Sequence, residues 1–282
     1  MNSFWDAQLN SLKRREIESV FKHVPGNAFE KALELGAGNG YQSGFISKYV
    51  KRLFSADLNY KRLRNGKAAD VSYLVCDAEN VDSCFSGPKF DLVFSSSLLE
   101  HLPRPGLALR NMSKVLKKDG ILIHIIPNAF WKACHFFLFF PDRFLLFAKK
   151  IKEVRKWPEI FIKYFCKYSE SPPGMGNNPK AEKPPQTLFG NLFWPHPHGA
   201  YKSNLQELKM YRRRRWESLF QGAGFRVIRT IPGPVSSGYG FGFRKIAASL
   251  ESFGICSVFA YVAVKSGEKS DFARFFLNQQ GS

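Results

Sequence analysis

The sequence predicts an α/β fold, in which a mostly parallel sheet of seven strands carries helices on both faces. Short apolar runs alternate with amphipathic stretches through the first 127 residues. Strands separated by helices of this length imply parallel pairing with right-handed crossovers. A glycine-rich turn joins the first apolar run to the next amphipathic stretch, as is typical of ligand-binding sheets of this kind.

Each predicted element follows from apolar periodicity. Five strands are expected in the N-terminal part, at 31–35, 52–56, 72–75, 90–94 and 121–126. Helices are expected at 3–23, 41–49, 60–69 and 107–116. A longer helix over 203–221 begins at a capping box of Ser203 and Gln206 and ends at Gly222 and Gly224. Two further strands, 225–231 and 257–264, complete the sheet as an antiparallel edge hairpin.

The chain divides into four parts by composition. Residues 1–127 form the core of the sheet, and residues 203–265 form the C-terminal part of the same fold. Between them, residues 128–202 are first aromatic and basic, and then rich in Pro, Gly and Asn. We expect this insertion to form a helical, aromatic cap after the fifth strand. Residues 266–282 are a tail.

The positive charge is concentrated in the middle of the chain. The net charge is +19, and residues 128–230 alone hold 19 Lys and Arg against 7 Asp and Glu. Residues 1–127 hold 18 against 13. Such a basic region favours a polyanionic partner, which is nucleic acid, anionic lipid or a phosphorylated substrate.

The cysteines and the N-terminus indicate a cytoplasmic protein. The five cysteines are scattered and form no CxxC pair, so neither a disulfide framework nor a zinc site is expected. Residues 1–10 lack the basic region and apolar run of a signal peptide.

The strongest local signal is the stretch from Leu33 to Gly40, with the sequence LELGAGNG. It follows a predicted strand and opens a helix, where glycines let the backbone turn sharply and approach a ligand. The helix adds its positive N-terminal end. The spacing is Gly-x-Gly-x-Gly, and Tyr41 stands where a dinucleotide-binding turn has its third glycine. A pyrophosphate-binding loop is therefore disfavoured.

Acidic residues follow the next two strands. Asp57 ends the second strand, where a carboxylate can bind both hydroxyls of a ribose, and Asp77 lies just past the third, where an adenine would lie. The fourth strand, Asp91–Ser95, is aimed at the same edge. Taken alone, Asp57 is equally consistent with a helix cap, but the order of these features favours an adenosine site.

Residues 31–127 resemble the Rossmann-like cofactor half of class I S-adenosylmethionine-dependent methyltransferases, especially the small-molecule group that includes quinone-biosynthesis enzymes. The match also includes Leu99–Leu102 and Val115–Gly120, whereas Asn111-Met112-Ser113 replaces a stretch that often carries Glu. The resemblance implies S-adenosyl-L-methionine as the cofactor. It also implies the cofactor-binding residues Glu34, Gly36, Ala37, Gly38, Gly40, Asp57, Leu58, Asp77, Ala78 and Ser95.

Two histidines are candidates for a catalytic base. His101 follows the fourth strand near the expected acceptor, but the Glu-His pair belongs to the general pattern of the family, which favours a histidine that packs and hydrogen-bonds at a helix start. His198 lies in a Pro-rich stretch just before the helix at Ser203, and a histidine near neutral pKa suits removal of a hydroxyl proton. The alternative is an exposed turn. His196 and His198 lack an evident third ligand, so no metal site is predicted.

The fourth strand ends in Ser95-Ser96-Ser97 and lacks the Asn/Asp-Pro-Pro-aromatic tetrad of methylases that act on base amines. This favours O-methylation of a small or amphiphilic acceptor, such as a glycan, a lipid-linked sugar or a quinone-like compound. The basic charge keeps an RNA- or DNA-modifying methyltransferase as one alternative. A non-catalytic, membrane-associated binding protein with the same fold is the other.

Residues 130–168 interleave aromatic and basic side chains. The apolar run is shorter than the ~20 residues needed to span a bilayer and is broken by charges. An interfacial segment carries this mixture, and so does a cap whose aromatics are ordinary core. The first alternative predicts a lid that also contacts an amphiphilic acceptor or an anionic membrane surface at its cytoplasmic face. The second predicts a helical cap over the active site.

Overall fold

A computed structural model describes residues 3–63, 68, 70–138, 203–236 and 244–277. They form one seven-stranded sheet with the order β3-β2-β1-β4-β5-β7-β6. The first five strands are parallel, and only β7 runs antiparallel to its neighbours. The strands are β1 (Phe29–Leu35), β2 (Val50–Asp57), β3 (Val71–Val75), β4 (Phe90–Ser96), β5 (Leu116–Pro127), β6 (Phe225–Pro232) and β7 (Val258–Lys265).

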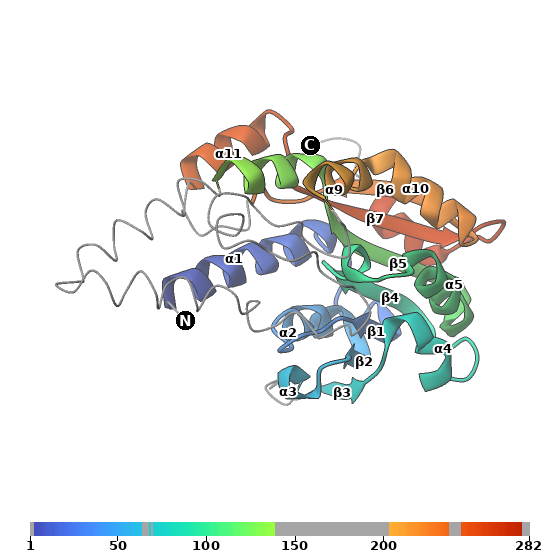
Figure 1. Cartoon of the computed structure of the whole chain (residues 1–282). Helices are drawn as coiled ribbons and strands as arrows, with labels where there is room; N and C mark the ends of the chain where they lie inside the picture. The colour runs from blue at the N-terminus through green and yellow to red at the C-terminus, as the bar shows by residue number, and fades with distance from the viewer. Residues whose placement is uncertain (1–2, 64–67, 69, 139–202, 237–243, 278–282) are drawn as a thin grey trace, which may run out of the picture.

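Both faces of the sheet are covered, as predicted (Figure 1). On one face, α5 (Pro105–Val115) and α10 (Arg213–Gly222) bury Met112, Trp216 and Phe220 in an apolar cluster. On the other, α1 (Ser3–Val20) buries Ile17 and Val20, and α12 (Arg274–Leu277) adds Phe276. The α/β class, the seven strands and the mostly parallel pairing are therefore confirmed.

The segments between the first strands contain shorter helices than predicted. The stretch after the glycine turn forms α2 (Ser43–Ile46) and the 3-10 helix η1 (Ser47–Tyr49) in place of one helix over 41–49. In the next connection the structure describes α3 (Tyr60–Leu63), and most of the rest of the helix predicted over 60–69 lies outside the described residues. The third holds η2 (Ala78–Asn80) and α4 (Val81–Cys84), which the apolar pattern did not indicate. The 3-10 helix η3 (Leu99–His101) follows β4.

The prediction of one continuous helix over 203–221 is wrong, because this segment contains two helices. It forms α9 (Asn204–Met210) and α10, separated at Arg212, which has an extended backbone with ψ 135°. Tyr211 and Trp216 are both buried, five positions apart. Five residues advance a helix by about 500°, so a straight helix would point one of the two rings about 140° away from the core. Ser203 does cap α9, because its Oγ accepts from the amide of Gln206 at 3.1 Å.

The C-terminal strands are partly as expected. The antiparallel pair β6 and β7 is confirmed, but β7 lies between β5 and β6, so the pair is not a simple hairpin added at the edge. The connection between them includes α11 (Arg244–Ser252), which was not predicted. The 3-10 helix η4 (Asp271–Ala273) and α12 follow β7, within the segment expected to be a tail.

The predicted cap lies largely outside the described residues. A helix begins at Ala129 directly after β5 and is described as far as residue 138, and residues 139–202 are not described. In the described ranges, no helix is both long enough and apolar enough to cross a membrane. The lid and membrane-contact interpretations of residues 130–168 both stay predictions.

Candidate functional site

The predicted cofactor residues lie at one edge of the sheet, where four adjacent parallel strands end. Leu35 of β1 is paired with Ala56 of β2 on one side and with Ser95 of β4 on the other. Asp57, the last residue of β2, is paired with Val75 of β3. Because neighbouring strands are about 4.8 Å apart, the segments that follow these strands lie side by side at one rim.

The glycine turn has the backbone geometry that its sequence predicts. Gly36, Gly38 and Gly40 have φ values of 75°, 58° and 75°, in the left-handed region that favours glycine. A Cβ on Gly36 would lie 3.1 Å from the side chain of Leu98, and one on Gly40 would lie 2.6 Å from the Tyr73 hydroxyl. A Cβ on Gly38 would meet no atom within 4 Å. Gly38 is therefore the glycine with free space beside it.

Glu34 supports this turn from below. Its side chain is buried, and Oε2 accepts from the hydroxyls of Ser43 in α2 and Ser55 in β2, at 2.5 and 2.7 Å. Burial raises the pKa of the Glu34 carboxyl, and the two hydroxyl donors act in the opposite direction. The side chain thus ties β1, β2 and α2 together beneath the turn.

Asp57 connects the turn to the end of β2. Its Oδ2 accepts from the amide of Gly38 at 2.8 Å, and its Oδ1 accepts from the amide of Asn59 at 2.8 Å. Each carboxylate oxygen keeps a second lone pair, which is what a pair of ribose hydroxyls needs. The next residue, Leu58, is exposed and adds an apolar surface beside the acid. The carboxylate thus accepts from the glycine turn and from the segment before α3, and its ribose-binding role stays a prediction.

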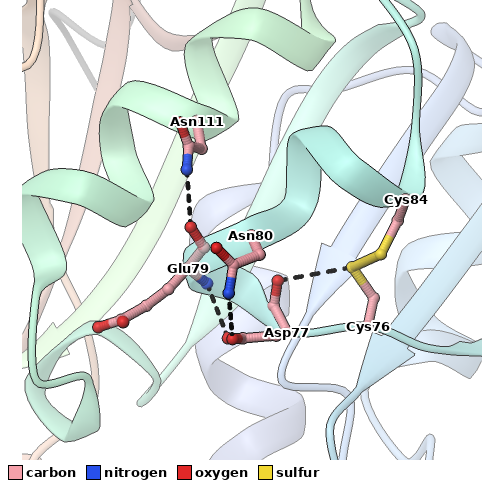
Figure 2. The surroundings of a disulfide bond; sticks show 6 residues. All are labelled: Cys76, Asp77, Glu79, Asn80, Cys84 and Asn111. Atoms are coloured by element: carbon pink, nitrogen blue, oxygen red, sulfur yellow. Dashed lines mark hydrogen bonds between the residues drawn. A yellow bond between two sulfur atoms is a disulfide. The ribbon is translucent and has the colours of Figure 1, made fainter.

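Asp77 caps η2, which follows β3 (Figure 2). Its Oδ1 accepts from the amide of Glu79 at 2.9 Å, and its Oδ2 accepts from the Asn80 side chain at 2.7 Å. These bonds hold the carboxylate and the backbone of Ala78 at the rim, in the place predicted for the adenine.

Helix α5 holds η2 in place through contacts that sequence reasoning missed. The Asn111 amide donates to the backbone carbonyl of Glu79 at 2.7 Å, as Figure 2 shows. The Glu79 carboxylate is buried and accepts from the amide and the guanidinium of Arg104, just before α5. Asn111, in the stretch that departs from the family pattern, thus fixes the segment that carries Asp77.

Replacing Asn111 by alanine is expected to lower the free energy of unfolding by about 1–3 kcal/mol, because it leaves the buried carbonyl of Glu79 without its donor. The affinity for S-adenosylhomocysteine should fall about threefold to tenfold as η2 loosens. Urea denaturation and titration calorimetry measure the two effects. Ser113→Ala on the same helix is the control, and equal behaviour of the two variants would contradict the role of Asn111.

The structure pairs Cys76 and Cys84 as a disulfide, which corrects the expectation that no disulfide forms (Figure 2). The two residues are eight positions apart, but η2 and α4 turn the chain back and bring their Cα atoms to 6.5 Å. That separation is within the range a disulfide spans. The scattered spacing gave no sign of the pair, because the turn between the cysteines was not predicted.

Ser95 is buried at the end of β4 and contacts His124 of β5. Ser95 Oγ lies 2.5 Å from His124 Nδ1, and the imidazole stacks on Phe220. Burial lowers the pKa of His124 to about 3, so this ring is neutral at physiological pH. The pair fixes the backbone of Ser95 next to the glycine turn.

The two candidate bases have different outcomes. His101 ends η3, and burial, followed by the charges of Arg62 and Lys13, lowers its pKa. A lowered pKa keeps the imidazole neutral, which a base requires. His198 and His196 lie outside the described residues, so their role stays a prediction.

A polar network that was not predicted lies where β4 ends beside α1. The Lys13 ammonium contacts Glu16 at 2.9 Å and donates to the hydroxyls of Ser96 and Ser97 at 3.0 and 3.1 Å. Ser97 has a φ of 52°, unusual for a residue with a side chain. Two features of the sequence could have indicated this network: the serine run at the strand end and the Lys-x-x-Glu spacing in α1.

The residues at this rim fit S-adenosylmethionine. The open space beside Gly38 admits an approaching ligand, the free lone pairs of Asp57 suit a ribose, and Asp77 with Ala78 borders the position of an adenine. Glu34 and Ser95 support these groups from the sheet.

Comparison with known proteins agrees with this geometry. Residues 33–124 match the model of a family described as a methyltransferase domain. The whole fold is similar to a solved structure described as a putative S-adenosylmethionine dependent methyltransferase from Listeria monocytogenes. That match has a TM-score of 0.51 at 14% identity and covers 91% of this chain and 99% of the other.

Residues 33–124 form a methyltransferase domain. The predicted family is therefore confirmed, and with it S-adenosyl-L-methionine as the cofactor of the methyltransferase domain. The matched range contains the glycine turn, both rim aspartates and Ser95.

Curated relatives match less than half of this chain. One is "Arginine-hydroxylase NDUFAF5, mitochondrial" of Danio rerio, 35% identical over 96 residues, which are 34% of this chain and 30% of the relative. Another is "Ubiquinone biosynthesis O-methyltransferase" of Caulobacter vibrioides, 28% identical over 107 residues, 36% of this chain and 42% of the relative. The chain thus matches less than half the length of these relatives. Because their names give different reactions, the shared segment does not determine the reaction.

Proposed function

We propose that the protein transfers the methyl group of S-adenosylmethionine to a hydroxyl oxygen of a small or amphiphilic acceptor, such as a glycan, a lipid-linked sugar or a quinone-like compound. The observation that carries the proposal is the convergence of the glycine turn, Asp57 and Asp77 on one rim of the sheet. The strand end Ser95-Ser96-Ser97, which lacks the base-amine tetrad, supports an oxygen acceptor.

When bound, the cofactor would supply a methyl group attached to a positively charged sulfur. An acceptor oxygen would bond to the methyl carbon and displace that sulfur in line. The chain contributes alignment and a place for the acceptor proton. Asp57 and the amide-rich turn hold the adenosine and methionine parts, and the rigid ends of β1 and β4 fix the direction of approach. The aromatic and basic segment 130–168 suits an acceptor with an apolar chain, which is why an amphiphilic acceptor is included.

Nucleic-acid methylation is the second candidate, because residues 128–230 have an excess of 12 positive charges, that is, 19 minus 7. The two candidates predict different acceptors. A hydroxyl acceptor requires a base at the rim, whereas a nucleic acid would bind with strong salt dependence through counterion release.

A methyl-transfer assay separates the candidates. Radiolabelled S-adenosylmethionine is incubated with the protein and with dodecyl gallate, dodecyl maltoside or a mixed RNA. We expect label in one or both of the dodecyl compounds and background label in RNA. Label in RNA alone would contradict the proposal in favour of the nucleic-acid reaction. Label in none, with retained cofactor binding, would favour a non-catalytic binding protein.

A further inference from the structure

Charged side chains, all of them buried except the half-buried Lys13, gather at the part of the rim where β4 and β5 end, next to the cofactor residues. They come from four separate segments of the chain: Lys13 and Glu16 of α1, Glu100 of η3, Lys132 of the helix after β5, and Glu207 of α9. Charged side chains are seldom this buried unless they are paired, so the pairing within this cluster is informative.

Two of the three carboxylates in the cluster have an ammonium partner. Glu16 contacts Lys13 at 2.9 Å, and Glu207 contacts Lys132 at 2.6 Å. Among the residues that the structure describes, no ammonium lies within ion-pair distance of Glu100. Its side chain is 1% exposed, and neither of its oxygens accepts a hydrogen bond from another described residue. His101 Nε2 lies 3.9 Å from Glu100 Oε1.

Glu100 lies close to the place where the methyl group would be transferred. Leu98, two residues before it, is the side chain that an added Cβ on Gly36 would meet. Ser95, at the end of the same strand, is paired with Leu35, which opens the glycine turn. The segment between them, Ser96-Ser97, is anchored to α1 through Lys13. The backbone that carries Glu100 is therefore fixed next to the glycine turn, which brings this residue near the methionine end of the predicted cofactor site.

We propose, on the basis of the proposed function, that Glu100 is a catalytic residue that takes the proton of the acceptor hydroxyl as that oxygen is methylated. The carbon–sulfur bond of the sulfonium breaks, and its electrons stay on sulfur as a neutral thioether. The acceptor oxygen forms the new carbon–oxygen bond. Its proton moves to the Glu100 carboxylate, which becomes a neutral carboxylic acid and later returns the proton to water.

The surroundings of Glu100 suit this role. Burial raises its pKa to about 8, and the charges of Glu16 and Glu207 add to the rise, while its own backbone amide and Lys13 oppose it. A base of raised pKa binds a hydroxyl proton more strongly than an ordinary carboxylate does, and efficient bases titrate near the working pH. The ionised form grows as pH rises toward 8, so activity should rise over the same range.

The same burial makes Glu100 costly for folding. Its pKa in the folded protein is raised above the ordinary value of 4.5. The contribution of this carboxyl to the free energy of unfolding is therefore fully present below about pH 4.5. That contribution is lost as pH rises through the folded pKa. Glu100→Gln removes the ionisation and keeps the shape. This variant should therefore be more stable than the wild type at neutral pH, because it no longer has a carboxyl that burial keeps neutral.

The test uses the full chain with labelled S-adenosylmethionine and dodecyl gallate or dodecyl maltoside, whichever the wild type methylates better. Glu100→Gln is expected to lower kcat at least ~100-fold, the typical contribution of a general base. Its affinity for S-adenosylhomocysteine should stay within about twofold, and its melting temperature at pH 7 should rise by about 5 °C or more. The rise of kcat/KM toward pH 8 should disappear, and Glu100→Asp should restore part of the rate.

Glu16→Gln is the matched control, because it neutralises a buried carboxylate of the same cluster that has a partner. This change should lower the melting temperature, since Lys13 loses its counter-charge. A Glu100→Gln variant with kcat within threefold of the wild type would overturn the role of Glu100. So would a variant that loses activity and thermal stability together. A wild type that labels neither dodecyl compound contradicts the proposed function instead, and the assignment of Glu100 then falls with it.

Discussion

Replacing Asp57 by alanine is expected to weaken the binding of S-adenosylhomocysteine at least ~100-fold. The variant loses the acceptor for the ribose hydroxyls and also the contact from Oδ2 to the amide of Gly38. Hydrogen bonds to a charged group contribute about 1.5–3 kcal/mol each, and about 1.4 kcal/mol is a tenfold change in affinity, so two lost ribose bonds suffice. Titration calorimetry at fixed salt measures the change.

Two further substitutions serve as the intermediate variant and the control for this measurement. Asp57→Asn keeps one oxygen acceptor and should bind with an affinity between those of the wild type and the alanine variant. Asp82→Ala removes a surface carboxylate paired with Lys114 and should bind as the wild type does. An Asp57→Ala variant that is folded and binds within threefold of the wild type would remove Asp57 from the cofactor site.

Replacing Gly38 by alanine is expected to weaken the binding of S-adenosylhomocysteine about 10-fold to 100-fold while the protein stays folded. The residue has a φ of 58° and nothing within 4 Å of an added Cβ, so the methyl group would occupy the space beside the turn. The backbone cost of a non-glycine residue in this conformation is about 1–2 kcal/mol. This cost lowers the free energy of unfolding, whereas the loss of affinity would come from exclusion of the ligand by the added methyl group.

Gly87→Ala is the matched control for Gly38→Ala. Gly87 has a φ of 72° and also has no atom within 4 Å of an added Cβ, but it lies in the loop before β4, away from the rim. Both variants should therefore lose similar stability in urea denaturation, and only Gly38→Ala should lose affinity. Equal affinity in the two variants would show that no ligand approaches Gly38.

The sequence predicted those features of the fold that repeat along the chain. The alternation of apolar runs identified all seven strands, because buried strands need continuous apolar stretches. It failed where tertiary packing overrides local pattern. Arg212 interrupts the helix after Ser203, and this break allows both Tyr211 and Trp216 to be buried. Helix α11 and the short helices between β3 and β4 have too few turns to show a clear period.

The cofactor side of the site was more predictable than the acceptor side. The glycine turn and the acids after β2 and β3 come from consecutive strands, so their order in the chain determines their order along the rim. The acceptor side draws Lys13, Glu100, Lys132 and Glu207 from distant parts of the chain. No spacing in the sequence indicates that such residues meet, and only the folded arrangement reveals which carboxylate is left without a partner.

Hydrogen–deuterium exchange with and without S-adenosylhomocysteine tests the central claim most directly, because the claim is that three separate segments bind one ligand. The ligand should slow exchange in three segments together: the glycine turn at 36–40, the end of β2 at 57–59, and η2 at 77–80. Protection of only one of these segments, or protection confined to another face of the sheet, would contradict a shared adenosine site at this rim.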